Sequence, residues 1–393
     1  MKFIVPVIVL IAACGDNVHA ECDGVLSVYM FGEPVLAMVK TRGVWAPLQR
    51  ESETLPFQAC VDDEYTVVGV CNDSLGISVN QAFGFVSDRQ EVYFGSCESS
   101  SGDPSDFVSV TGHMKQPGTV YVGGSGDRSA LPNWDFSVAV RPGRHALTAS
   151  DDVGDGNGAY RVAIRREVEL DNATAIEDVD LDAEGIETVE FDLGAILLAD
   201  ESVFTSTDLQ IDGTLHQIST SSSSSVRCVG QLEHGERQIV QAVAEAMPDP
   251  QRFSFRAIIN SFEDIPAEKL ELLPRIDDAQ GFSADGRSAV IDPPAFNFNY
   301  ANVVSVGPNS LYLTATKGWM DSNGYSIRPD LSPPGFDPSW LEGRIDIVSL
   351  ELVAEDKYLT RATATREQRS QSLRPAKPRF GYPRYVGFRN MPR

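Results

Sequence analysis

The sequence predicts an all-β chain in which two or three consecutive antiparallel β-sandwich-like domains follow an N-terminal export segment. Short runs rich in Val, Thr, Phe and Tyr recur along the 393 residues, and turn residues such as Asp-Gly, Asn-Gly and Pro-Gly separate them. The length exceeds what one ordinary core needs. We therefore divide the chain into units at 22–101, 104–190 and 191–378, with a basic aromatic tail at 379–393.

The first residues are typical of an export signal. Lys2 supplies a positive charge, and the apolar run 3–13 is too short to span a bilayer as a helix. The run ends in Ile11-Ala12-Ala13-Cys14, which resembles the lipobox of a bacterial lipoprotein signal peptide. This resemblance implies loss of residues 1–13, lipidation of Cys14 and a polar tether over 14–21. The alternatives are an ordinary secretory signal and an uncleaved anchor.

A lipid on Cys14 implies a protein held at the membrane of the bacterial cell envelope. Gly15 follows the cysteine, where the usual inner-membrane retention signal of such lipoproteins has Asp, so we favour the outer membrane. The formal net charge of −24 argues against nucleic acid as a partner, because the phosphates would be repelled. The acidic stretch 151–212 and the basic stretch 355–393 are interpreted first as solvated surfaces.

The early cysteines Cys22, Cys60, Cys71 and Cys97 predict disulfides, since an exported chain folds in an oxidising compartment. Among the pairings that four cysteines allow, we favour Cys22–Cys97 with Cys60–Cys71, which nests a hairpin bridge inside a bridge between the ends of the unit. Cys228 is left over. We interpret it as a half-buried free thiol, because no sequence feature supplies a base beside it.

In the first unit we expect strands at 25–31, 35–40, 44–48, 64–71, 77–85 and 91–97. Within 64–71, apolar residues occupy both alternating sets: Tyr65, Val67 and Cys71 on one, Val68 and Val70 on the other. This pattern indicates a central strand that is covered on both faces. The polar stretch 99–104 is expected to end the unit as a linker.

The second unit has expected strands at 108–112, 120–122, 136–140, 146–149, 160–164 and 167–170, followed by an acidic strand over 178–182. Phe136, Val138 and Val140 should point to one side, and Pro142-Gly143 should form the turn. This strand, Pro-Gly turn and returning strand resemble the carboxypeptidase-regulatory, transthyretin-like β-sandwich. The resemblance implies a fold and an accessory role, and it transfers no catalytic residue.

The third unit remains strand-like, at 189–193, 209–211, 253–259, 311–316 and 345–352. The stretch 239–247 has helical spacing, but we interpret it as a strand because 248–250 is a Pro-Asp-Pro turn. A short helix is expected at 266–273. The serine run 219–225 is expected to be a surface loop between strands.

Calcium is the only cofactor for which the sequence offers ligands. The candidates are Asp151, Asp152, Asp155 and Asn157, hard oxygen donors in a glycine-rich stretch. Val162 stands where an EF-hand would need its bidentate acid, so that motif fails. We favour an ordinary acidic turn, because Asp, Asn and Gly populate turns for backbone reasons.

No catalytic motif is complete. The sequence has no Gly-x-Ser-x-Gly elbow and no His-Glu-x-x-His, and its five histidines are scattered. Trp319 and Trp340 are interpreted as core anchors, although aromatic residues also bind sugars. The tail 379–389 interleaves rings with arginines and could contact anionic lipopolysaccharide or sugars, but we favour packing on the protein's own body.

We therefore expect a lipid-anchored envelope protein that binds an envelope or extracellular glycan or protein and is not an enzyme. Two alternatives stay open. One is an envelope glycan hydrolase, which would bring an Asp/Glu pair together in a deep cleft. The other is a structural assembly lipoprotein, which would have flat faces and a stable partner.

Overall fold

The computed structural model describes residues 24–369 except 51, 53–54, 74–75, 98–106, 129–133, 153–157, 171–173, 176–177, 193–196, 250–251, 264–271, 277–280, 283–285, 295 and 356–359. Strands dominate these residues, which confirms the predicted all-β class. The described helices are α1 (Leu181–Glu184), α2 (Lys317–Asn323) and the 3-10 turn η2 (Pro338–Leu341).

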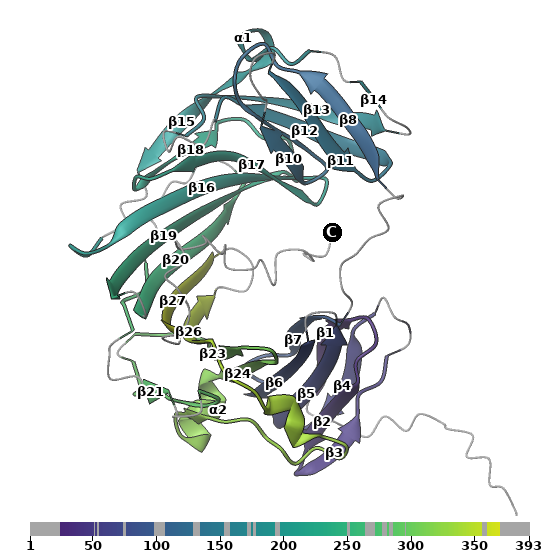
Figure 1. Cartoon of the computed structure of the whole chain (residues 1–393), viewed down its shortest axis with the longest axis vertical. Coiled ribbons are helices and arrows are strands. Elements are labelled where there is room, and N and C mark those ends of the chain that lie inside the picture. Colours follow the sequence, from purple (N-terminus) through teal and green to yellow (C-terminus); the bar gives the residue numbers. More distant parts are fainter. Residues whose placement is uncertain are drawn as a thin grey trace, which may run out of the picture.

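A first sandwich packs a small sheet, in the order β4-β1-β7, on one end of a much longer sheet (Figure 1). Leu26, Val28 and Met30 alternate along β1 and point into the core between the two layers, where they meet Tyr65 and Val67 of β5. The strands involved are β1 (Gly24–Phe31), β4 (Phe57–Val61) and β7 (Glu91–Ser96) on one side, and β2 (Leu36–Thr41), β5 (Glu64–Asp73) and β6 (Gly76–Phe85) on the other.

Strand β5 is covered on both faces, as its sequence predicted. Tyr65 and Val67 belong to the core of the first sandwich, whereas Val68 and Val70 belong to a second core on the other side of the strand. A strand with apolar residues in both alternating sets can bury them only between two layers. The long sheet is therefore the middle layer at this end of the molecule.

A second sandwich occupies the other end of the molecule (Figure 1). Its inner side chains include Val110, Val138, Leu147 and Leu170. One sheet has the order β11-β8-β14, from β8 (Val108–His113), β11 (Asp135–Val140) and β14 (Thr174–Ala175); the other has the order β10-β9-β12-β13-β15-β18, from β9 (Thr119–Val122), β10 (Ser125–Arg128), β12 (Gly143–Ser150), β13 (Arg161–Leu170), β15 (Ile186–Asp192) and β18 (Ser225–Val229).

The Pro142-Gly143 turn connects the two sheets of this sandwich. Phe136, Val138 and Val140 point inward as predicted, because β11 alternates exposed and buried positions along its length. However, β11 pairs with β8, whereas β12 pairs with β9 and β13. The returning strand therefore lies in the opposite layer and does not form a hairpin with the strand before the turn.

The long sheet joins the two ends of the molecule and forms the back of its C-shaped outline (Figure 1). Its order is β17-β16-β19-β20-β27-β26-β23-β24-β6-β5-β2-β3. The parallel pairing of β24 with β6 brings strands of the predicted first and third units into one sheet. Its remaining strands are β3 (Val44–Pro47), β16 (Ser202–Ile211), β17 (Thr214–Ser221), β19 (Arg237–Asp249), β20 (Arg252–Phe262), β23 (Tyr300–Val306), β24 (Ser310–Thr316), β26 (Ile347–Glu355) and β27 (Thr360–Arg369).

Between β24 and β16, the long sheet has two different faces. On the packed face, Leu313, Val303 and Leu352 contact a layer of loops that includes β21 (Gly281–Phe282), β22 (Ala289–Val290) and β25 (Ser326–Ile327). The alternate residues of the same strands form what we call the opposite face. It comprises Tyr312 and Thr314 of β24; Tyr300, Asn302 and Val304 of β23; Ser349, Glu351 and Val353 of β26; Phe253, Phe255, Ala257 and Ile259 of β20; Gln241, Val243 and Glu245 of β19; and Phe204 and Ser206 of β16.

Local signals located several turns correctly. Asp212 and Gly213 connect β16 to β17, and both have positive φ, 51° and 75°. A two-residue hairpin turn of this kind needs left-handed backbone at both positions, which Asp and Gly tolerate. The stretch 239–247 lies within β19 and pairs with β20, so its interpretation as a strand is confirmed.

The favoured disulfide pairing is wrong, because Cys71 is bonded to Cys97. The favoured pairing assumed that Cys60 and Cys71 lie on two strands of one hairpin. Instead, Cys60 lies on β4 in the small sheet and Cys71 on β5 in the long sheet. Cys60 is also disulfide-bonded, and Cys22 lies outside the described residues. The Cys71–Cys97 bond links the two layers of the first sandwich.

Two local predictions on helices and strands also need correction. The acidic stretch 178–182 is not a strand face: Asp180 caps α1, and its side chain accepts from the Asp182 amide. An Asp side chain satisfies a free amide at a helix start, which favours the helix over an extended edge. The structure also has α2, capped by Thr316, which the sequence analysis did not predict. Most of the helix expected at 266–273 lies outside the described residues.

Candidate functional site

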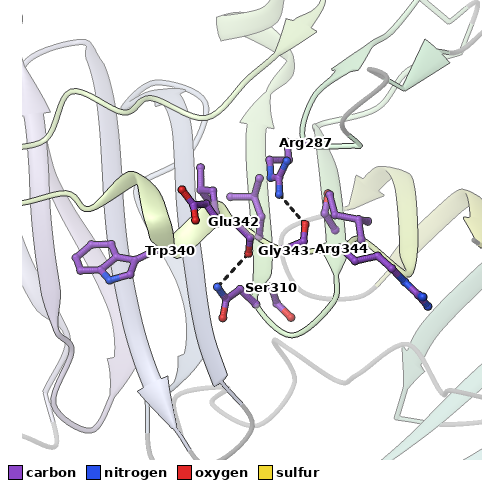
Figure 2. A pocket seen from close by; sticks show the side chains of 11 residues that line it. Arg287, Ser310, Trp340, Glu342, Gly343 and Arg344 are labelled. Atoms are coloured by element: carbon purple, nitrogen blue, oxygen red, sulfur yellow. Dashed lines mark hydrogen bonds between the residues drawn. The ribbon is translucent and has the colours of Figure 1, made fainter.

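A small surface pocket lies where the β23–β24 turn meets the end of η2 (Figure 2). Most of its polar groups hold loops together. The Arg287 guanidinium donates to the Gly343 carbonyl at 3.0 Å, the Asn309 amide donates to the Glu342 carbonyl at 3.3 Å, and Arg344 pairs with Asp346. The lining residues are Arg287, Ser305, Asn309, Ser310, Leu311, Trp340, Leu341, Glu342, Gly343, Arg344 and Ile345.

The chemistry of this pocket is that of a loop junction. Glu342 is the one carboxylate among the lining residues, and neither histidine nor cysteine lines it. General acid–base or nucleophilic catalysis needs a titratable group aimed at a reacting atom. The Trp340 ring packs edge-on to Phe336 with 5.3 Å between centroids, and both rings are partly buried against the core of the packed face. Trp319 is also partly buried against this core, 5.0 Å from the Phe83 ring, so both tryptophans pack on the core as predicted but are not enclosed by it.

Of the candidate calcium ligands, the structure describes Asp151 and Asp152, and both carboxylates already accept hydrogen bonds. Asp151 accepts from the amides of Tyr160 and Arg161 at 2.6 and 3.0 Å. Asp152 is buried and accepts from the amide and hydroxyl of Thr220 at 2.5 and 2.9 Å. Asp155 and Asn157 lie outside the described residues. Within 24–369, less the gaps given above, no three potential metal ligands cluster.

The described histidines do not come together as a metal site. His113 and Asp135 lie 3.3 Å apart on the surface of the second sandwich, and the His145 ring lies 2.7 Å from the Arg141 carbonyl. His216 is fully buried between β17 and β12, where its ring contacts the hydroxyls of Thr148 and Thr214 at 3.2 and 2.8 Å. Burial lowers the pKa of His216 to about 4. A backbone hydrogen bond with Tyr121 and the charge of Asp212 act to raise this pKa, but their effect is smaller than that of burial.

The free thiol of Cys228 is not half-buried, as expected, but completely buried. Burial raises its pKa to about 12. A thiol of this kind stays protonated at neutral pH and is a poor nucleophile. Its position in the core between β18 and β19 is that of a small apolar side chain.

Among the residues that the structure describes, the most buried ion pair lies at the start of β16. The Glu201 carboxylate is fully buried and binds both Arg256, through two nitrogens, and Arg275, at 3.0 Å. Burial alone would raise the pKa of Glu201, but hydrogen bonds from Arg256, the Leu198 amide and Arg275 lower it. Each buried charge in this network has a partner of opposite sign, as a buried charge requires. The network links β16, β20 and the segment that contains Arg275.

The opposite face carries a polar ladder that the sequence analysis did not identify. The Thr314 hydroxyl donates to Asn302 at 2.8 Å, and the Asn302 amide donates to Glu351 at 2.7 Å, so three neighbouring strands are connected in one row. Tyr300 lies beside this row; its hydroxyl donates to Glu355 at 3.1 Å and its ring lies 4.3 Å from the Arg89 guanidinium. The available signal was the alternation of apolar with polar and aromatic residues along β23 and β24.

Several predicted functional positions, Cys14, the tether 14–21 and the tail 379–393, lie outside the described residues. Among the residues that the structure does describe, no helix is long and apolar enough to cross a bilayer.

No protein-family model, curated protein or solved structure matches this chain. The resemblances to a lipoprotein signal peptide and to the carboxypeptidase-regulatory sandwich therefore stay predictions.

Proposed function

We propose that this chain is an exported, lipid-anchored protein of the bacterial cell envelope, held in the outer membrane, with a non-enzymatic binding role. The observation that carries the proposal is the Cys71–Cys97 disulfide between the two layers of the first sandwich. Disulfides form and persist in oxidising compartments outside the cytosol. Together with the apolar run that ends at Cys14, the bond favours export followed by lipidation of that cysteine.

The binding role is supported by how three of the described ionisable groups are used. Glu201 and Glu236 are held by arginines, and His216 by burial between two layers, so each of these shifted groups has a structural partner. The glycan-hydrolase alternative requires two carboxylates across a cleft, and the pocket of Figure 2 contributes Glu342 alone. We leave the ligand at the level of an envelope or extracellular glycan or protein.

The structural-assembly alternative is favoured by one specific observation. The long sheet runs without interruption from the first sandwich to β16 and β17, and these two strands pack on the second sandwich through a shared apolar core and side-chain hydrogen bonds. A rigid connection of this kind suits a protein that spaces other envelope components. A stable partner recovered by in-cell crosslinking would favour assembly over reversible ligand binding.

Lipidation and location are tested together by fractionating cells that express the natural chain or a Cys14→Ala variant. We expect the natural chain to take up labelled palmitate and to sediment with outer membranes, and we expect the variant to do neither. Protease added to intact cells then reports whether the β domains face outward. Membrane retention of the unlabelled variant would overturn the lipid-anchor proposal.

A further inference from the structure

The opposite face of the long sheet is more buried than its described neighbours explain. Val353, Ala257 and Ile259 are 0%, 2% and 4% exposed, yet the five described hydrophobic cores include none of them. Strand β18, which contacts β19 from outside the sheet, lies on the packed face. Something beyond the described elements must therefore cover this face.

We propose that the opposite face, between β24 and β16, is the docking site for the C-terminal segment of the same chain, residues 370–393. The described chain reaches Arg369 at the end of β27, which lies between β20 and β26 in the middle of this face. Neighbouring strands are about 4.8 Å apart and an extended chain advances about 3.3 Å per residue. The segment is therefore long enough to cross the face in either direction.

Other parts of the chain are less well placed to cover it. Leu272, Leu273 and Ile276, which lie between two undescribed stretches, pack on the cores of the packed face. Residues 250–251 and 356–359 are too few to cross the face. The C-terminal segment follows the central strand of this face and is long enough to cross it.

The chemistry of the two surfaces is complementary. The opposite face presents the carboxylates of Glu245 and Glu351 and the half-buried rings of Phe204, Phe253 and Phe255. Burial raises the pKa of Glu245, so a cation placed near it would stabilise its charged form. The segment has no acidic residue and contains Arg374, Lys377, Arg379, Arg384, Arg389 and Arg393, together with Phe380, Tyr382, Tyr385 and Phe388. Arginines next to rings can pair with carboxylates and stack on aromatic faces.

Photo-crosslinking in the full chain tests this docking. We would replace Phe255 with the photoreactive residue benzoylphenylalanine, irradiate the purified protein and map the crosslinked peptides by mass spectrometry. We expect crosslinks within single molecules to peptides from 370–393. The same residue at Val44, which is 67% exposed on the edge strand β3, is the matched control and should give none to this segment.

A triple charge reversal, Arg379→Glu with Arg384→Glu and Arg389→Glu, should abolish the crosslink from position 255, and high salt should weaken it. If the Phe255 variant does not fold, Tyr312 on β24 provides the second crosslinking site. Crosslinked dimers would identify a second copy as the occupant, and folded monomers without crosslinks to 370–393 would show that the segment does not dock; either result overturns the proposal. The test does not depend on lipidation or on the ligand of the proposed function.

Discussion

The buried histidine gives the sharpest quantitative test of the fold. His216 lies between β17 of the long sheet and β12 of the second sandwich, where burial lowers its pKa to about 4 from an ordinary 6.5. The unfolded chain therefore binds a proton between pH 6.5 and 4 that the folded chain does not. Stability should be complete above about pH 7 and should decrease as the pH falls through this window.

The magnitude follows from the two pKa values. The difference of 6.5 − 4, or 2.5, corresponds at 1.36 kcal/mol per pKa unit to about 3.4 kcal/mol once the pH is below both values. At pH 5 the unfolded histidine is almost fully protonated and the folded one is mostly neutral, so the loss there is about 2 kcal/mol. A His216→Gln variant cannot titrate and should lose this part of the pH dependence.

The assay is urea unfolding of both proteins at pH 7.5 and pH 5. We expect the free energy of unfolding to fall by about 2 kcal/mol more in the natural chain than in His216→Gln. Thr214→Val, which removes a hydroxyl partner but keeps the imidazole, is the control and should retain most of the pH dependence. Equal pH dependence of the natural chain and His216→Gln would refute the argument that the ring is buried and neutral.

Three further predictions concern the other buried groups. Replacing both Cys71 and Cys97 by Ser opens a link across a sequence separation of 26 and should lower the free energy of unfolding by about 3.5 kcal/mol, measured by denaturant titration; an unchanged midpoint would contradict it. Glu201→Gln leaves the Arg256 charge buried without its anionic partner and should lower the free energy of unfolding by about 3–5 kcal/mol. The control Asp200→Asn removes a half-exposed pair and should lower it by less than about 1 kcal/mol. Similar losses in the two variants would exclude this account. Cys228 should resist iodoacetamide in the native protein and react fully in denaturant, as intact mass can show; native labelling would mean that the core opens there.

Local sequence signals predicted the strands and turns well because their causes are local. The two apolar sets along β5 required cover on both faces, and Asp212-Gly213 supplied the left-handed backbone of a hairpin turn. The disulfide was mispredicted because pairing depends on which sheet each strand joins. Cys60 and Cys71 lie on successive strands, but those strands belong to different layers.

Long-range features had no sequence signal. The parallel pairing of β6 with β24 joins Val79 to Leu311, and neither strand carries a pattern that specifies so distant a partner. His216 follows Thr214 and Leu215 in a mixed polar stretch, so its burial depends entirely on the sandwich that packs over it. The polar ladder on the opposite face also depends on long-range pairing. Thr314, Asn302 and Glu351 form one row only because three strands come into register.

The junction between the second sandwich and the long sheet gives the candidate calcium residues a structural role. Asp152 holds Thr220 of β17, the Ser219 hydroxyl accepts from the Ala159 amide at 3.1 Å, and Arg166 binds Glu236 at 2.6 and 2.8 Å. These contacts surround a shared apolar core that contains Leu209 and Ile218.

The serine run belongs to the same junction. It is not simply a surface loop, because Ser219 is 1% exposed and the Thr205 hydroxyl donates to the Ser225 carbonyl at 2.9 Å. Small hydroxyl side chains let the chain pass closely from β17 to β18 while they satisfy its backbone groups. Protonation of His216 would place a positive charge inside this junction, so acid should first loosen the contact between the second sandwich and the long sheet. The first sandwich, linked by Cys71–Cys97, should persist to lower pH.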